Sequence, residues 1–126
     1  MVVDASIVVR GLEREGPSRD LLIDGSLHVP HLADQEVAQA LRAQVRRGTT
    51  SADAAETRLL RWRALGVRRW AAVDLLPRVW ALRDNLTASD ATYVALAEAL
   101  GCPLATADRR LAAAPGPRCE IVIFEA

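Results

Sequence analysis

Short apolar runs alternate with longer segments in which apolar residues recur at helical spacing. The runs are predicted to be strands, at 2–3, 27–29, 67–73, 103–105 and 121–124. The segments between them are predicted to be helices, at 6–12, 18–23, 32–47, 51–65, 75–83, 87–100 and 108–113. Strands that alternate with helices favour a parallel sheet covered on both faces. We therefore expect one α/β domain over residues 1–126, a three-layer α/β/α arrangement around about five strands.

The helices expected at 32–47 and 51–65 are joined through Gly48 and predict a helical hairpin rich in arginine. The chain has sixteen basic and sixteen acidic residues, so its formal net charge is zero, and every basic residue is an arginine. Half of these arginines fall between residues 42 and 69, beside only two acids. Two interpretations are open: a basic rim whose planar guanidinium groups bind phosphate, or solvated helix faces in an arginine-rich chain.

The absence of lysine excludes two classes of phosphate-handling protein. A P-loop nucleotidase needs the lysine of its GK[ST] motif, and a phosphoacceptor receiver domain also requires one. No apolar run approaches the roughly 20 residues of a membrane span. The opening residues MVVD lack the basic region of a signal peptide. We expect a cytoplasmic protein.

The cysteines and histidines do not predict a zinc site. Cys102 and Cys119 are two residues without a second pair, so neither a disulfide framework nor a zinc site is expected. We interpret them as buried thiols beside neighbouring strands. His28 and His31 lack the spacing of metal ligands, and His31 is interpreted as a turn residue rather than a support for a nearby site.

Four carboxylates stand where predicted helices begin, and three of these lie at or just past an apolar strand. In an open α/β sheet, strand ends and the helix starts that follow them share one edge, where ligands bind. Carboxylates that meet there repel each other and raise each other's pKa. Such a cluster favours Mg²⁺ or Mn²⁺, which prefer oxygen ligands. The four candidates are Asp4, Glu36, Asp90 and Asp108.

Each acid also has a purely structural explanation. Asp4 and Asp108 are good N-cap residues. Thr87 and Asp90 match a capping box, and Glu36 is a first-turn acid favoured by the helix dipole. Capping accepts Ser, Thr or Asn as readily as Asp, so four true acids at one edge exceed what capping requires. A metal-dependent site for phosphate transfer or phosphodiester cleavage is our first hypothesis.

Four segments, in this order, resemble the PIN domain and more narrowly the VapC-type ribonuclease toxins of bacterial toxin–antitoxin pairs. They are MVVDAS, VPHLADQEVAQALR, RDNLTASDATYVALAEALG and CPLATADRRL. The resemblance runs from Met1 to about Leu111 and covers most of the chain. It implies a Mg²⁺-dependent endoribonuclease, with Mn²⁺ as a possible substitute, that hydrolyses RNA phosphodiester bonds.

The resemblance also assigns roles to single residues. The four acids above take the places of the family's metal-binding and catalytic residues, and Ser6 and Thr106 match hydroxyl positions that support them. Members of the family often carry a further acid where this chain has Arg110, which leaves the occupancy of a second metal position open. Asp34 is a nearby acid that either compensates for this departure or caps a helix.

Several basic residues are candidates for contact with RNA. Arg83 and Asn85 fit the family pattern, either as contacts to phosphate or as braces of a loop. Arg46 and Arg61 belong to the arginine-rich hairpin, whose expected phosphate contacts would support affinity without reading sequence.

The three tryptophans receive different interpretations. Trp62 lies between Arg61 and Arg63, and either stacks on a base or packs in the core or an interface. Trp70 and Trp80 are expected in the core.

The resemblance implies a small cognate VapB-type antitoxin as partner and a homodimer, and the hairpin at 32–65 is our candidate for either contact. Two rival functions remain. A small-substrate phosphohydrolase would need a DxDxT-type loop, whereas Ala5 and Ser6 follow Asp4 without a second aspartate. A non-catalytic interaction module would keep the fold but has no need of all four acids.

Overall fold

The protein folds around a five-stranded parallel sheet in the computed structural model, which describes residues 1–124. The strands are β1 (Val2–Val3), β2 (His28–Pro30), β3 (Arg68–Trp70), β4 (Leu104–Thr106) and β5 (Ile121–Ile123). They pair in parallel in the order β3-β2-β1-β4-β5. This confirms the predicted sheet. The domain expected over 1–126 includes residues 125–126, which lie outside the described residues.

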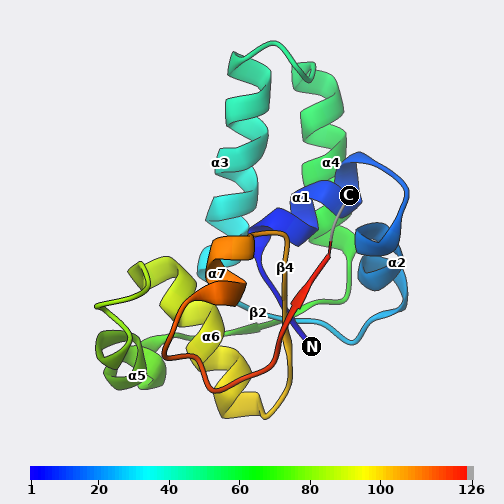
Figure 1. Ribbon diagram of the computed structural model, residues 1–126. Helices are drawn as coiled ribbons and strands as arrows, with labels where there is room; N and C mark the ends of the chain where they lie inside the picture. Colours follow the sequence, from blue (N-terminus) through cyan, green and yellow to red (C-terminus); the bar gives the residue numbers. More distant parts are fainter. Residues whose placement is uncertain (125–126) are drawn as a thin grey trace.

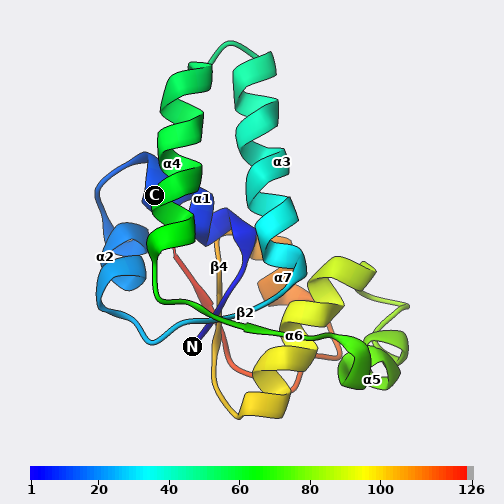
Figure 2. The same cartoon turned by 180° about the vertical axis from the view of Figure 1, so that it is seen from behind.

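Helices cover both faces of the sheet, as Figures 1 and 2 show from opposite sides. The helices are α1 (Ala5–Glu13), α2 (Pro17–Asp24), α3 (Leu32–Arg46), α4 (Ala52–Ala64), α5 (Leu76–Ala81), α6 (Ala88–Leu100) and α7 (Arg109–Ala113), with a 3₁₀ turn η1 (Val73–Leu75) before α5. Helix α6 contacts β1, β2 and β4, and α1 packs with α2, α3 and α4 in the other layer. Within the described residues, no helix is long and apolar enough to cross a membrane.

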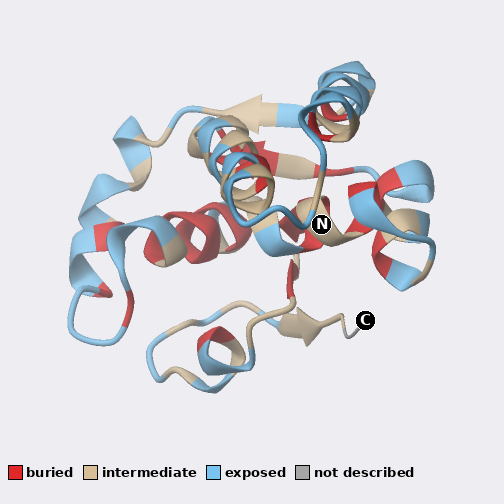
Figure 3. Cartoon of the chain, turned by 90° about the horizontal axis from the view of Figure 1, so that it is seen from above, coloured by how far each residue is buried: buried red, intermediate tan, exposed pale blue. Residues whose placement is uncertain are grey.

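Helix α6 is the most deeply buried helix of the fold, visible as the red helix in Figure 3. Its inner residues from Ala91 to Ala97 are all buried, because small alanines let the helix lie close to the sheet. Thr87 caps its start by accepting a hydrogen bond from the backbone N–H of Asp90 at 3.2 Å. Gly101 ends it with a φ of 63°, a conformation that glycine adopts without strain. Both helix limits were predicted from the sequence.

The parallel register brings the C-terminal ends of the central strands to one edge. Val3 pairs with Ala105, so β1 and β4 end side by side, and α1 begins directly after β1. The two valines of β1 are fully buried at the centre of the sheet. Asp4 and Thr106 are therefore held next to each other although about a hundred positions separate them in the chain.

Helices α3 and α4 form the predicted hairpin, which projects from the body of the molecule in Figure 1. Its base is joined to the sheet through Asp34, which lies in the first turn of α3. The carboxylate of Asp34 accepts hydrogen bonds from the Trp62 indole N–H at 2.8 Å and from the Arg69 guanidinium at 2.8 and 2.9 Å. Asp34 therefore neither caps the helix nor joins the acidic site, and both earlier interpretations of it were wrong.

The three tryptophans occupy different environments. Trp62 is 2 % exposed, which confirms its packing in the core and leaves its ring unable to stack on a base. Trp70 is half-buried, and its indole N–H donates to Nδ1 of His28 at 3.0 Å. Trp80 is 68 % exposed, so its predicted core position was wrong. The short helix α5 turns Val79 inward, which leaves Trp80 on the outer face.

The third strand and the two cysteines differ in part from the predictions made from the sequence. The third strand spans Arg68–Trp70 rather than 67–73, because η1 begins at Val73 and the chain leaves the sheet after Trp70. Cys102 and Cys119 lie beside β4 and β5 as expected, but both thiols are half-buried rather than buried. His31 is in a turn, as predicted.

The hydrogen bonds that Asp34 accepts from Trp62 and Arg69, which we call the Asp34 brace, are expected to stabilise the fold. Asp34→Ala should lower the free energy of unfolding by about 1–3 kcal/mol, because it leaves the Trp62 N–H and the Arg69 guanidinium without their acceptor. Arg69 holds the pKa of Asp34 below its ordinary value of 3.8. The contribution of ionised Asp34 to the free energy of unfolding is thus complete above pH 3.8. It is lost as the pH falls through the lower pKa that Asp34 has in the folded protein. Urea denaturation at several pH values measures it.

The exposed α4 residue Glu56 provides a control, since Glu56→Ala should change stability by less than about 0.5 kcal/mol. Equal effects of the two substitutions at neutral pH would show that the brace does not hold the hairpin.

Candidate active site

Asp4 is a buried carboxylate at the end of β1, where it also caps α1. It is 7 % exposed, and its Oδ1 accepts a hydrogen bond from the backbone N–H of Ile7 at 3.3 Å. The hydroxyls of Ser6 and Thr106 donate to its two carboxylate oxygens. Burial raises the pKa of Asp4 most, the three hydrogen bonds oppose that rise, and the charge of Asp90 adds to it.

The same two hydroxyls connect Asp4 to the segment that carries Asp108. Ser6 Oγ accepts a hydrogen bond from the backbone N–H of Ala107 at 3.1 Å. Thr106 Oγ1 accepts one from the backbone N–H of Asp108 at 3.0 Å. Each hydroxyl thus donates to Asp4 and accepts from the chain just after β4. The supporting positions expected for Ser6 and Thr106 correspond to these contacts.

Glu36 lies on α3, and a tyrosine of another helix, α6, holds its carboxylate by a hydrogen bond. The hydroxyl of Tyr93, on α6, donates to Glu36 Oε1 at 2.6 Å. Burial raises the pKa of Glu36, the Tyr93 hydrogen bond opposes that rise, and the charges of Asp90 and Asp4 add to it. Burial and the adjacent Glu36 also raise the pKa of Tyr93, so that its proton stays on the phenol as a donor.

Sequence reasoning did not identify Tyr93. It lies three residues after Asp90 on α6, a spacing that places two side chains on the same face of a helix. That spacing was the available signal, but a buried tyrosine on an apolar helix is equally consistent with packing alone. Only the position of α3 relative to α6 shows that its hydroxyl reaches Glu36.

Asp90 and Asp108 complete the acidic group from two other helix starts. Burial raises the pKa of Asp90 most, the hydrogen bond with Thr87 opposes that rise, the charge of Asp108 adds to it, and Arg110 partly offsets it. Asp108 caps α7 by accepting from the backbone N–H of Arg110 at 2.9 Å. The Arg110 guanidinium lies 3.7 Å from the same carboxylate. The positively charged side chain of Arg110 therefore stands at the position where many family members carry a further acid.

The four acids form a continuous electrostatic group. Repulsion couples Asp4 to Asp90, Glu36 to both of these, and Asp90 to Asp108. Within residues 1–124, however, no three His, Cys, Asp or Glu side chains are close enough to form a ready ligand set for a bare metal ion. Mg²⁺ keeps several of its waters in proteins and often uses one or two carboxylates. The donor type and spacing therefore fit a hydrated cation rather than a fully protein-enclosed one.

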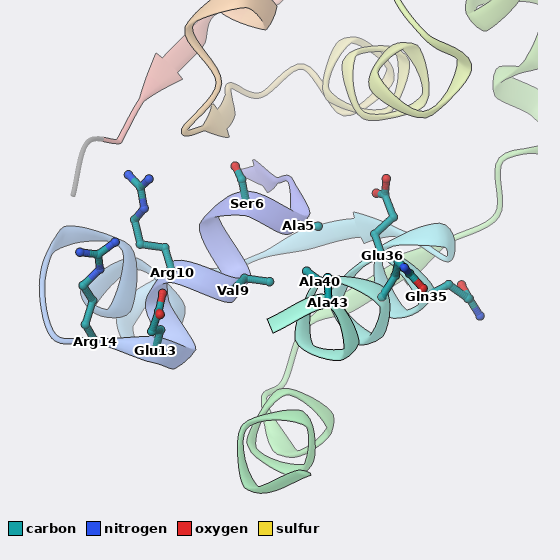
Figure 4. Close-up of a pocket in the computed structure, with 11 residues that line it drawn as sticks. Ala5, Ser6, Val9, Arg10, Glu13, Arg14, Gln35, Glu36, Ala40 and Ala43 are labelled. Atoms are coloured by element: carbon teal, nitrogen blue, oxygen red, sulfur yellow. The ribbon is translucent and has the colours of Figure 1, made fainter. Parts of the chain in front are cut away.

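A groove between α1 and α3 leads away from this group and is shown in Figure 4. Its volume is about 750 Å³. Glu36 stands at one end, and Arg10, Glu13 and Arg14, from the last turn of α1 and its C-cap, stand at the other. We call this feature the α1–α3 groove. Of the four acids, Glu36 is the one that lines it.

The arginines singled out in the sequence lie elsewhere. Arg46 is exposed in the last turn of α3, at the tip of the hairpin. Arg61 lines a different hollow, between α4, α2 and the end of α1. Arg83 donates to the backbone carbonyl of Trp80 at 3.0 Å, and its guanidinium stacks 4.8 Å from the centre of the Trp80 ring. Their contact with RNA stays a prediction.

Burial and repulsion between the acids predict that removing the charge of Asp90 stabilises the protein. The pKa of Asp90 is raised in the fold, so the folded protein binds more protons than the unfolded chain above pH 3.8, and stability falls as pH rises toward the folded pKa. Asp90→Asn should therefore stabilise the metal-free protein at neutral pH by up to about 1 kcal/mol. Thermal unfolding in chelator measures the effect, which should shrink as pH approaches 3.8.

The exposed loop residue Asp84 serves as the control, and Asp84→Asn should change stability at neutral pH by less than about 0.5 kcal/mol. A destabilising effect of Asp90→Asn at neutral pH would contradict the coupling between the acids.

The chain resembles known proteins over most of its length. The PIN domain model matches residues 1–117. A VapC ribonuclease of Mycobacterium bovis is 45% identical over 123 residues, covering 98% of this chain and 97% of that protein. Ribonuclease VapC1 of Mycobacterium tuberculosis is 45% identical over 125 residues, covering 95% of this chain and 94% of that protein.

Solved structures agree in fold. PAE2754 from Pyrobaculum aerophilum aligns with a TM-score of 0.73 at 30% identity, over 95% of this chain and 81% of the other. A toxin–antitoxin complex from Klebsiella pneumoniae aligns with a TM-score of 0.67 at 16% identity, over 99% of this chain and 98% of the other. The chain belongs to the PIN-domain family and, within it, to the VapC ribonucleases.

Proposed function

We propose that this protein is a metal-dependent endoribonuclease that acts as the toxin of a VapBC-type toxin–antitoxin pair. The observation that carries this proposal is the convergence of four carboxylates from four separate elements into one repelling group. Such a group costs stability unless a cation offsets it, which is the signature of a functional site. The relatives that match almost the whole chain are named as ribonucleases.

Mg²⁺, with Mn²⁺ as an alternative, is the proposed cofactor. Asp4, Asp90 and Asp108 would hold it directly or through its waters, and Glu36 would hold one of those waters. When bound, the ion would lower the pKa of the attacking water and would neutralise charge on the phosphoryl oxygens. Arg110 adds a positive charge beside Asp108, so one ion fits the site better than two.

The remaining residues orient this chemistry. Ser6 and Thr106 fix both oxygens of Asp4, and Thr106 fixes the start of α7 beside it. Tyr93 holds Glu36 in place and favours its ionised form. The hydrogen bonds keep the carboxylates in position against their mutual repulsion.

The activity is proposed to occur in the cytoplasm, together with a small cognate VapB-type antitoxin and in a homodimer. The first support is membership of the VapC ribonucleases, and the second is the fold shared with the toxin–antitoxin complex described above. The α3–α4 hairpin stays our candidate for either protein contact, since it projects from the body of the molecule.

Loss of the ion or of one ligand should abolish cleavage. EDTA should stop cleavage of a purified RNA and added Mg²⁺ should restore it. Asp4→Asn and Asp90→Asn should each lower the cleavage rate at least roughly 100-fold, since loss of a mere supporting partner already costs 10- to 100-fold. Asparagine also caps helices well, so Asp4→Asn keeps the start of α1.

The exposed substitution Glu56→Gln is the matched control and should retain full activity. Cleavage that survives chelation, or both aspartate substitutions, would exclude the proposed nuclease. Hydrolysis of p-nitrophenyl phosphate without RNA cleavage would support the small-substrate alternative. A folded protein inactive on every substrate would support the non-catalytic one.

The α1–α3 groove is our proposed path for the RNA backbone, because Glu36 lines one end and the other end carries two arginines against one acid, Glu13. In an Asp90→Asn background, Arg14→Ala should weaken RNA binding by up to roughly fivefold, as for an exposed ion pair. It should also reduce the salt dependence of binding, because one phosphate contact fewer releases fewer counterions. Arg46→Ala and Arg61→Ala are the comparison variants, and a larger effect of either would place the RNA on the hairpin.

A further inference from the structure

Two cysteines lie just before the last two strands of the sheet. Leu104 of β4 pairs with Ile121 of β5, and the Leu104 N–H donates to the Glu120 carbonyl at 2.9 Å. Cys102 and Cys119 each precede their paired residue by two positions. Both cysteines therefore lie near the N-terminal ends of two neighbouring strands, at the opposite end of these strands from the acidic site.

The two thiols also share one hollow. It has a volume of about 550 Å³, and Cys102, Cys119, Glu98 and Arg118 contribute to its wall. Both cysteines are free and half-buried, so a small molecule can reach them from the hollow. In the described part of the chain, no third ligand-type side chain joins them to complete a metal set. The chemistry open to the site is that of the two sulfurs themselves.

We propose that Cys102 and Cys119 form a dithiol site that closes to an intrachain disulfide when it reacts with a small-molecule disulfide. Neighbouring strands lie about 4.7–4.9 Å apart, and bridged cysteines have Cα atoms about 4.4–6.8 Å apart. Extending this strand spacing by two residues from the Leu104–Ile121 pair would bring Cys102 and Cys119 into the range that a disulfide spans. Both residues lie just outside the ladder, where the backbone can adjust to the bond.

The reaction proceeds in two balanced exchange steps. One cysteine loses its proton to solvent, and its thiolate attacks a sulfur of the small disulfide, releasing one small thiolate and leaving a mixed disulfide on the protein. The second cysteine then loses its proton and attacks the protein sulfur of that mixed disulfide, releasing the second small thiolate. Two cysteine thiols are oxidised, and one small disulfide is reduced to two thiols.

The bond would close a loop that contains part of the acidic site. The segment between the cysteines includes Thr106 and Asp108, together with helix α7. In the described sheet, β5 is an edge strand that pairs with β4 alone. Oxidation would fasten this edge strand to β4, and so restrict the segment that positions Asp108. This inference does not depend on the proposed nuclease activity.

The surroundings of Cys119 make its thiol harder to ionise. Burial raises the pKa of the Cys119 thiol most, the charge of Glu98 and the neighbouring Cys102 add to the rise, and its own backbone N–H and Arg78 oppose it. Arg78 is largely occupied by its ion pair with Glu98, at 2.7 Å. Because the thiolate is the attacking species, exchange should accelerate as pH rises from 7 to 9.

The test is to incubate the native protein with oxidised glutathione and to measure its intact mass without reduction. We expect a loss of two hydrogens per chain and no retained glutathione. Trypsin cleaves after Arg83, Arg109 and Arg118, so the bond should join peptide 84–109 to peptide 119–126. The oxidised monomer should also unfold several degrees higher than the reduced one.

The single variants Cys102→Ser and Cys119→Ser are the controls, because each can form the mixed disulfide but cannot resolve it. Each should retain one glutathione per chain and show no rise in its unfolding temperature. Two glutathione adducts on the native protein, unreacted thiols, or disulfides formed only between chains would each overturn the proposal. None of these measurements uses RNA, so a failure here leaves the nuclease proposal untouched.

Discussion

The arrangement of the site depends on one buried carboxylate. Asp4 is almost fully enclosed, and it stays in place because two hydroxyls and one backbone N–H donate to it. Those donors come from both sides of the sheet edge, since Ser6 lies on α1 and Thr106 ends β4. Asp4 therefore caps a helix, joins two strand ends and contributes charge to the site. The helix-capping role and the proposed functional role of Asp4 therefore belong to the same side chain.

The acids around Asp4 illustrate a conflict between stability and function. Folding brings Asp4, Glu36 and Asp90 together, and burial with mutual repulsion raises the pKa of each. The fold maintains this arrangement through hydrogen bonds to Asp4 and through the phenol of Tyr93. A cation that bound the group would offset the repulsion, so the charges that weaken the free protein would also favour the binding of the proposed metal ion.

Asp34 and Arg110 show how charges near the site can serve other purposes. Asp34 is close in sequence to Glu36, yet it points to the base of the hairpin, where Trp62 and Arg69 share its oxygens. Arg110 faces Asp108 and lessens the negative charge on that side. Neither residue thus adds negative charge to the acidic group: Asp34 is used at the base of the hairpin, and Arg110 of α7 is positively charged.

The sequence by itself determined the order of elements, the parallel sheet, the hairpin and the four acids, because apolar periodicity and the limits of helices are local properties. Thr87 and Gly101 mark α6 in any context, and strand ends in a parallel sheet must share an edge. The sequence did not identify Tyr93 as the partner of Glu36, place Arg14 in a groove with it, or expose Trp80. Those facts depend on how α3, α5 and α6 pack across the sheet, and packing between distant segments leaves no periodic signal in one chain. Tertiary structure alone decided which side chains meet. A contact between distant residues requires two segments to be positioned relative to each other, whereas a helix forms within a single segment.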